Sequence, residues 1–356
     1  MAIRNIASVL ATGRGNNFDF MRFAAASSVI ISHSFVTTGN LEPTLGVTTL
    51  GRLGVSIFFI ISGFLITQSW IHHPNLGPFI AKRLLRIVPA LACVTLFVLL
   101  VLGPIFSTVS HAQYFQDRRI LAYLGNVSIF FLSYNLPGLW VHNPYPATTN
   151  APLWTLPMEF IAYLAVAGAG ITGLIKRKFS YIPAVLVVIA LTHIFSTILF
   201  TLGIEFQNHG SFYLLGNLAF FATGSFLYLR REDIIYSDKL ALVALAVIIF
   251  SVLVPWQFYL ELIALPYLVI YLALIPTRHL QQFAKYGDFS YGMYIYAWPL
   301  QQAAYGVTGG SLSPLMSLVY AYPLAVALAA ISWHGIEKHA LKLKKFLDRN
   351  PALRPV

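Results

Sequence analysis

The sequence predicts an all-α protein, a membrane-embedded bundle of about ten transmembrane helices that forms one domain. The chain has 356 residues, of which 58% are hydrophobic and only 10% are charged, whereas a soluble domain carries about 25% charged residues. Apolar stretches long enough to cross a bilayer recur along the whole length. No long polar segment lies between them, so we expect a single transmembrane domain over residues 1–356 and no fused extracytoplasmic domain.

Ten stretches have the apolarity and length of a membrane span, which needs about 20 residues. They occupy residues 18–38, 50–70, 82–103, 155–173, 181–201, 212–229, 239–254, 257–275, 289–306 and 314–334. A shorter apolar piece at 120–136 predicts an interfacial or re-entrant helix. The single cysteine, Cys93, excludes an intrachain disulfide.

The basic residues orient this bundle. They gather before the first span, at the start of the third and after the last, while the alternate loops carry almost no Lys or Arg. Only Arg118 and Arg119, next to Asp117, depart from this pattern. The positive-inside rule then predicts that both termini are cytoplasmic and that the protein lies in the cytoplasmic membrane. The same bias accounts for the net charge of +11 without a nucleic-acid partner.

Arg22 and His33 lie within the first predicted span, eleven residues apart. Titratable groups are costly inside a bilayer and therefore indicate function. A helix separates the two residues by about 16 Å, so Arg22 is expected near the inner face and His33 toward the outer face. Imidazole is the natural proton acceptor near neutral pH, which makes His33 a candidate general base. The alternative is a histidine that bonds a neighbouring helix and serves packing.

Lys82, Arg83 and Arg86 form a basic cluster at the cytoplasmic start of the third span. Arg83 and Arg86 are three residues apart and share a helix face. Paired guanidiniums bind phosphate through charged hydrogen bonds, so the cluster is a candidate phosphate site. The alternative is a positive-inside cluster whose side chains extend to the membrane surface.

The longest predicted outer segment combines flat aromatic rings with amides. Trp140, Asn143, Tyr145 and Trp154 belong to it. Such mixtures suit sugars, whose faces stack on rings and whose hydroxyls need hydrogen-bond partners. The alternative is an aromatic belt at the membrane interface.

Glu159 follows Trp154 by five residues at the start of the fourth predicted span. This spacing places the carboxylate just inside the outer membrane boundary, at the predicted depth of His33. A carboxylate bonded to imidazole fixes its tautomer and stabilises the imidazolium, so Glu159 is a candidate partner of His33. The alternative is an acidic residue in the first turn of a helix. No metal-ligand spacing, nucleotide-binding loop or nucleophile elbow is present.

Several segments, taken together and in order, resemble the membrane-bound acyltransferase family 3, whose members O-acylate cell-surface glycans. They are DFMRFAAASSVIISH, GRLGVSIFFIISGFLIT, KRLLRIVPAL, LWTLPMEF, YGDFSYGMYIYAWPLQQ and WHGIEKHA. One difference concerns the ninth span, where many members have His-Trp-Pro and this chain has Ala297-Trp298-Pro299. No role for a histidine there is implied.

The resemblance implies an acyl-coenzyme A donor in the cytoplasm, with acetyl as the default acyl group, and no metal. It implies an acceptor hydroxyl outside, on a surface polysaccharide or a lipid-linked oligosaccharide. His33 is then either the general base or a transient acyl carrier, and Glu159 orients it. The donor would be held by the basic residues at the inner face, Arg22, Lys82, Arg83 and Arg86.

Two other classes of protein also fit ten spans with polar residues inside the bilayer. One is a transporter or flippase of a lipid-linked glycan, although transporters often have two related halves and this sequence has none. The other is a non-catalytic partner of polysaccharide assembly. The sequence does not specify the oligomeric state.

Overall fold

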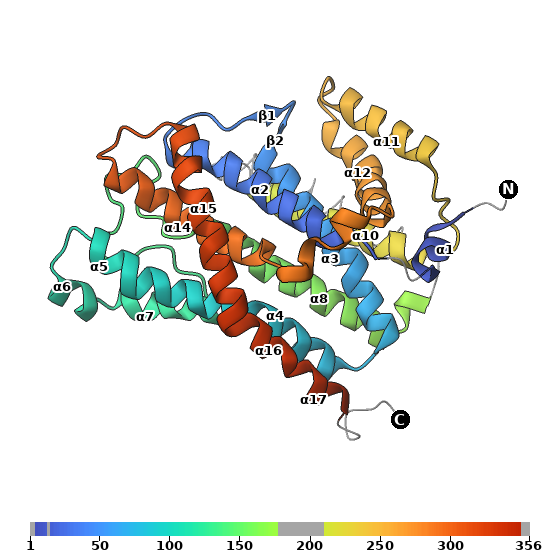
Figure 1. Ribbon diagram of the computed structural model, residues 1–356, viewed down its shortest axis with the longest axis horizontal. Coiled ribbons are helices and arrows are strands. Elements are labelled where there is room, and N and C mark those ends of the chain that lie inside the picture. The colour runs from blue at the N-terminus through green and yellow to red at the C-terminus, as the bar shows by residue number, and fades with distance from the viewer. Residues whose placement is uncertain (1–3, 13–14, 177–209, 350–356) are drawn as a thin grey trace, which may run out of the picture.

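The computed structural model describes residues 4–12, 15–176 and 210–349, which form a helical bundle with one short hairpin (Figure 1). Within these described residues, five helical stretches are long and apolar enough to cross a membrane by length and composition, namely Leu50–His72, Leu76–Phe106, Ala151–Ile171, Gln257–Leu274 and Pro314–Leu347. With the family features reported below, they identify a membrane protein.

The described elements follow the chain in a simple order. The N-terminal half contains α1 (Ile6–Ala11), α2 (Phe18–Thr37), β1 (Thr44–Leu45), β2 (Thr48–Thr49), α3 (Leu50–His72), α4 (Leu76–Phe97), the π-helix η1 (Val98–Leu102), α5 (Gly103–Phe106), α6 (His111–Gln116), α7 (Arg119–Leu124), η2 (Gly125–Ser128), η3 (Ala151–Trp154), α8 (Thr155–Ile171) and η4 (Leu174–Lys176). The C-terminal half contains α10 (Gly210–Leu229), α11 (Asp238–Ser251), α12 (Gln257–Leu274), α13 (Arg278–Gln281), η5 (Phe283–Tyr286), α14 (Ser290–Val307), α15 (Pro314–Ser332), the π-helix η6 (Trp333–Glu337), α16 (Lys338–Lys342) and α17 (Lys344–Arg349).

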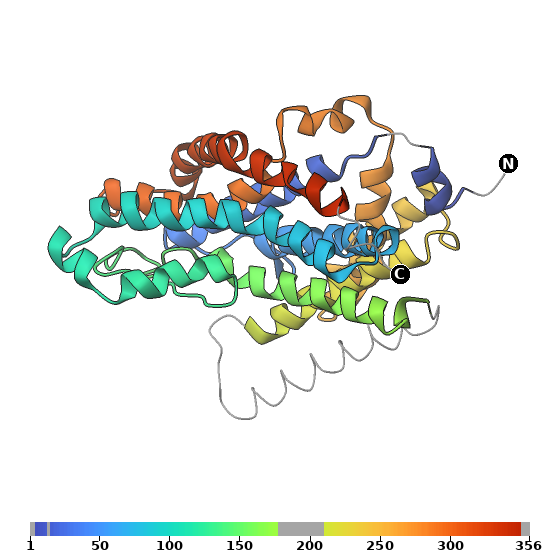
Figure 2. The ribbon, with the colours of Figure 1, turned by 90° about the horizontal axis from the view of Figure 1, so that it is seen from below.

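Nine of the ten predicted spans coincide with helices in the described part of the chain, and the predicted span at 181–201 lies outside it. The third prediction began too late, because α4 starts at Leu76. The apolar piece at 120–136 forms most of α7 and the short helix η2, followed by irregular chain. Helix α1 and helix α17 lie toward one end of the molecule, and α5, α6 and α7 lie at the other (Figures 1 and 2).

Helices α2, α3, α10, α14 and α15 form the closely packed centre. Small residues permit the tight contact between α3 and α10. A Cβ added at Gly63 would fall 2.0 Å from the carbonyl oxygen of Phe221, and one at Gly224 would fall 2.1 Å from that of Ile60. Glycine at these positions lets the two backbones approach, as is common between membrane helices.

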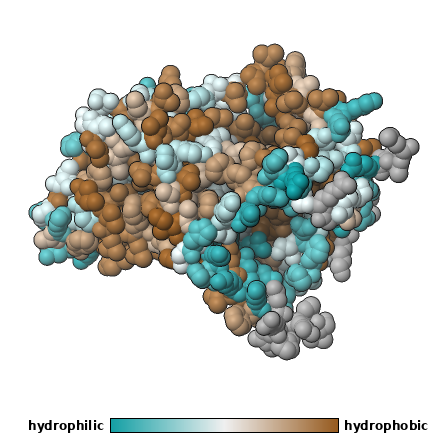
Figure 3. Space-filling model, viewed as in Figure 1, coloured by the Kyte–Doolittle hydropathy of each residue, from teal (hydrophilic) through white to brown (hydrophobic). Residues whose placement is uncertain are grey.

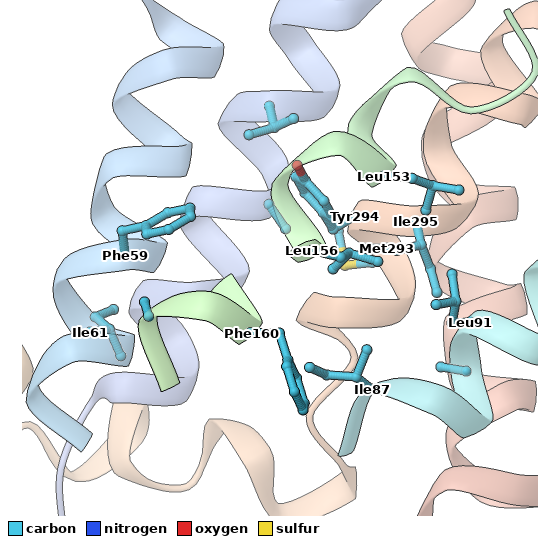
Figure 4. Close-up of a cluster of buried hydrophobic side chains, with 14 of the residues drawn as sticks. Phe59, Ile61, Ile87, Leu91, Leu153, Leu156, Phe160, Met293, Tyr294 and Ile295 are labelled. Carbon is cyan, nitrogen blue, oxygen red and sulfur yellow. The ribbon is translucent and has the colours of Figure 1, made fainter. Parts of the chain in front are cut away.

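The chain ahead of α8 enters the bundle instead of remaining at its end. We call residues 143–154 the inserted segment. It runs along α14, with hydrogen bonds from Gln302 to Tyr145 O, from Trp298 to Thr148 O and from Tyr294 to Pro152 O. Gln302, Trp298 and Tyr294 are four residues apart and therefore share one face of α14. Leu153 and Leu156 pack beside Tyr294 and Ile295, so α8 begins inside the bundle (Figure 4).

Candidate active site

A cavity of about 330 Å³ lies between α2, α3, α4, α8 and α14, and residues of α16 and α17 complete its wall. Its apolar walls come from α3, α4 and α8, including Val55, Phe58, Phe59, Ile87 and Leu156. Its charged lining consists of Arg22, Arg83, Arg86, Lys344, Glu159 and Asp288. The structure therefore brings Arg22, Arg83 and Arg86 together in one cavity, as the inner-face clustering predicted.

Asp288, in the loop before α14, links two of these arginines. Its Oδ2 atom accepts hydrogen bonds from Arg86 Nη2 at 2.5 Å and lies 3.1 Å from Arg22 Nη2. Its Oδ1 atom accepts a bond from Ser290 Oγ at 2.5 Å. Burial alone would raise the pKa of Asp288, but the charges of Arg86 and Arg22 outweigh it and lower the pKa to about 2. Asp288 is therefore ionised at neutral pH and offsets part of the arginine charge.

Arg83 differs from its two neighbours because no carboxylate pairs with it among the described residues. Its Nη2 atom donates to Ser69 Oγ at 3.0 Å, and its guanidinium lies 5.5 Å from the centre of the Phe79 ring. The Nε atoms of Arg83 and Arg22 are buried, and neither has a hydrogen-bond partner within the described residues. Lys82, the remaining member of the predicted basic set, is half-buried and does not line the cavity.

Glu159 lines the cavity through a small hydroxyl network. Its Oε1 atom accepts hydrogen bonds from Ser62 Oγ at 2.9 Å and from the Tyr163 hydroxyl. The predicted hydrogen bond between Glu159 and His33 is not formed. The His33 ring instead contacts Trp298 edge to face, with centroids 4.9 Å apart, and does not line the cavity.

The helix register explains why these two side chains are apart. Helices α2 and α3 are antiparallel, with Phe18 against Phe64 and Gly54 against Ser28. Ser62, which binds Glu159, therefore lies opposite the first turn of α2, roughly 15–20 Å below His33 along that helix. The prediction of equal depth was wrong, because the inserted segment carries the start of α8 inward before Glu159.

The aromatic residues predicted to bind the acceptor have different surroundings. Trp140 is 3% exposed and its ring is buried, so the prediction that it stacks on a sugar is wrong. Trp154 ends η3 and the inserted segment and is half-buried. The Asn143 amide donates to Gln302. Tyr145 alone of these four keeps an exposed ring, which contacts Trp298 at 5.1 Å between centroids.

Trp298 joins the exposed Tyr145 to His33. It is buried, contacts both rings edge to face, and donates from Nε1 to Thr148 O at 3.0 Å. Among the described residues the His33 imidazole has no hydrogen-bond partner. Its ring contacts Trp298, and its backbone carbonyl accepts a hydrogen bond from the Thr37 hydroxyl. In a neutral imidazole one ring nitrogen is a donor and the other an acceptor, and neither is used here by a described residue.

Sequence reasoning missed Asp288, Ser62 and Tyr163. Asp288 had a usable signal, since it is an acidic residue directly before a span in an otherwise basic loop. Tyr163 follows Glu159 by four residues on α8, so helical spacing was a usable signal for that contact. Ser62 is an ordinary residue of an apolar helix, and only the packing of α3 on α8 reveals its contact with Glu159.

Comparison with known proteins agrees with this architecture. The family model described as an acyltransferase domain matches residues 16–334. The chain is 28% identical over 337 residues to a protein named O-acetyl transferase from Shigella phage Sf6, covering 92% of this chain and 96% of the relative. It is 33% identical over 174 residues to nodulation protein 10 of Rhizobium leguminosarum bv. viciae, covering 44% of each chain. No solved structure matches the chain. The protein is therefore a member of the membrane-bound acyltransferase family 3.

Proposed function

We propose that the protein is an O-acyltransferase of the cytoplasmic membrane. In this proposal it moves an acyl group, acetyl by default, from cytoplasmic acyl-coenzyme A to a hydroxyl of a surface polysaccharide or lipid-linked glycan. The observation that carries the proposal is the cavity, in which cationic side chains lie at one end of an apolar channel. The name of the Shigella phage Sf6 relative supports acetyl as the acyl group.

The cavity has the features that a coenzyme A thioester requires. Arg83 has no carboxylate partner among the described residues, and the buried Nε atoms of Arg22 and Arg83 have no acceptor there. Guanidinium groups bind phosphate strongly in such partly buried places. The apolar wall formed by Val55, Phe58 and Leu156 suits the thin pantetheine arm, which would extend from the arginines toward the level of His33.

The reaction assigned to the site is a single acyl transfer. The acceptor oxygen attacks the thioester carbonyl carbon, a carbon–oxygen bond forms, and the carbon–sulfur bond breaks. His33 takes the proton of the acceptor hydroxyl and returns it to the departing sulfur. If His33 is instead an acyl carrier, its ring nitrogen attacks the thioester carbonyl and the carbon–sulfur bond breaks. The acceptor hydroxyl then attacks the acyl-imidazole carbonyl, the carbon–nitrogen bond breaks, and the hydroxyl proton passes to the released thiolate. Glu159 faces the donor arm in this arrangement and is not the partner of His33.

The test uses membranes from cells that express the chain and supply their own glycan acceptor. Acetyl-coenzyme A carrying a radioactive acetyl group is added, and label in the glycan fraction is measured together with release of free thiol. We expect both signals to require the protein and to fall at least about 100-fold in His33→Ala, because a general base contributes roughly 10²–10⁴-fold. The purified His33→Ala variant should still bind acetyl-coenzyme A, since His33 does not line the cavity.

Two results would contradict the proposal. Near-normal acylation by His33→Ala would remove the catalytic role of His33. Failure of the folded wild-type protein to bind acetyl-coenzyme A or to transfer label would reject the donor assignment. Movement of a lipid-linked glycan across the membrane without acylation would then favour a transporter.

A further inference from the structure

The C-terminal segment contributes to the cavity although it follows the part of the chain that matches the family. That match ends at residue 334. Helices α16 and α17 pack on α4, and Leu341 and Lys344 line the same cavity as Arg83 and Arg86. The segment is therefore part of the wall of the site and not only a basic tail.

Local structure explains why this segment turns toward the cavity. The π-helix η6 joins α15 to α16, and π-turns inside helices often occur at functional sites. Within η6, Glu337 Oε2 lies 3.9 Å from Arg86 Nη1 and Glu337 Oε1 accepts a hydrogen bond from Ser332 at 2.9 Å. Glu337, Leu341 and Lys344 are spaced by four and three residues, so they share the face that packs on α4.

Other lysines of the segment lie on different faces. Lys338, Lys342 and Lys345 are exposed, whereas Lys344 is half-buried and lines the cavity. Hydrophilic side chains gather over α16 and α17 beside the mostly apolar surface of the same view (Figure 3). Lys344 is thus distinguished from its neighbours by position and not by charge.

The charges of the cavity indicate the chemistry of its ligand. Its lining contains the cationic side chains of Arg22, Arg83, Arg86 and Lys344 and the carboxylates of Glu159 and Asp288, and Asp19 and Glu337 contact Arg22 and Arg86 from outside the lining. Arg83 has no paired carboxylate among the described residues, and it lines the cavity together with Lys344, an arrangement that fits a ligand with phosphate groups. A pantetheine thioester without phosphate groups would offer these two cations no anionic partner.

We propose that Lys344 binds a phosphate of the donor and that α16 and α17 form the cytoplasmic rim of the donor site. The inference rests on the proposed function and extends it to a segment beyond the family match. Lysine acts here as a point charge, and its placement beside Arg83 and Arg86 lets one polyanionic group contact α4 and the C-terminal segment together.

The experiment compares two single-charge variants of the same helix in the full-length protein. Lys344→Ala removes the cavity lysine, and the matched control Lys345→Ala removes its exposed neighbour. Calorimetry measures the affinity of each purified variant for acetyl-coenzyme A and for S-acetyl-pantetheine, which has no phosphate. We expect Lys344→Ala to weaken acetyl-coenzyme A binding about tenfold, the effect of losing one charged hydrogen bond. Lys345→Ala and Lys344→Arg should bind it as the wild type does.

The phosphate-free probe separates a lost phosphate contact from a damaged fold. S-acetyl-pantetheine should bind equally to all of these proteins. Equal acetyl-coenzyme A affinities of Lys344→Ala and Lys345→Ala would overturn the inference while leaving the proposed function intact. Equal weakening of both ligands by Lys344→Ala, and by Lys344→Gln as a second variant, would also overturn it. If the wild type binds neither ligand, the proposed function fails, and the inference fails with it.

Discussion

The three arginines of the cavity differ in what neutralises them. Arg22 and Arg86 share Asp288, and Arg86 also approaches Glu337. Arg83 has only the hydroxyl of Ser69 as a hydrogen-bond acceptor among the described residues. Asp288 already contacts N–H groups of Arg22 and Arg86. We therefore infer that Arg83 is the arginine most available to a phosphate, and that Arg86 also stabilises the fold.

This difference predicts different results for two alanine variants. Arg83→Ala should weaken acetyl-coenzyme A binding about tenfold or more, with a smaller loss for dephospho-coenzyme A and little change in thermal stability. Arg86→Ala should in addition lower the free energy of unfolding by about 1–3 kcal/mol, because the buried carboxylates of Asp288 and Glu337 would lose a positively charged partner. Calorimetry and thermal unfolding in detergent measure the two effects. Equal losses of stability in both variants would contradict the division of roles.

Among the elements, α14 explains how the inserted segment is held. Pro299 has no backbone N–H, so the carbonyl of Ile295, four residues earlier, lacks its helical donor. The Asn150 amide supplies that bond at 2.8 Å. Asn150 and the neighbouring Thr149 are fully buried. The Asn150 amide N–H and the Thr149 hydroxyl are both paired, whereas Asn150 Oδ1 has no partner among the described residues. Proline in α14 and asparagine in the inserted segment are therefore complementary.

The same pairing predicts the effect of removing the asparagine. Asn150→Ala should lower the free energy of unfolding by about 1–3 kcal/mol, because the buried Ile295 carbonyl loses its donor. The matched variant Asn143→Ala should cost less, since Asn143 is only half-buried and the carbonyl of Gln302 lies in a regular helical turn. Thermal unfolding of the purified proteins tests this difference. A larger loss in Asn143→Ala would show that the inserted segment is held mainly at its outer end.

For the whole molecule, the charge distribution predicts an orientation that can be measured. The positive-inside rule places the C-terminal segment in the cytoplasm and residues 104–153 outside. In a Cys93→Ser background, a membrane-impermeant maleimide should label Tyr145→Cys in intact cells, because that side chain is exposed. It should label Lys345→Cys only after the cells are opened. The reverse labelling pattern would invert the topology and place the cationic cavity toward the outside.

The sequence by itself determined the class of the molecule. Hydropathy and length located nine of the described helices, since these depend on residues close together in the chain. The motifs in order predicted the family, which the match over residues 16–334 confirmed. Charge and helical spacing also predicted that Arg83 and Arg86 would share one site near Arg22. All three arginines lie near the predicted cytoplasmic ends of their spans, and they line one cavity.

Only the tertiary structure decided the depth of Glu159 and the partners of the arginines. A helix that follows a long loop can begin at any depth, and here contacts of the inserted segment with α14, about 150 residues later, set the start of α8. Local pattern carries no information about such distant contacts. The same reason hid Lys344, whose place in the cavity wall depends on the helices packed beside it and not on its neighbours in sequence.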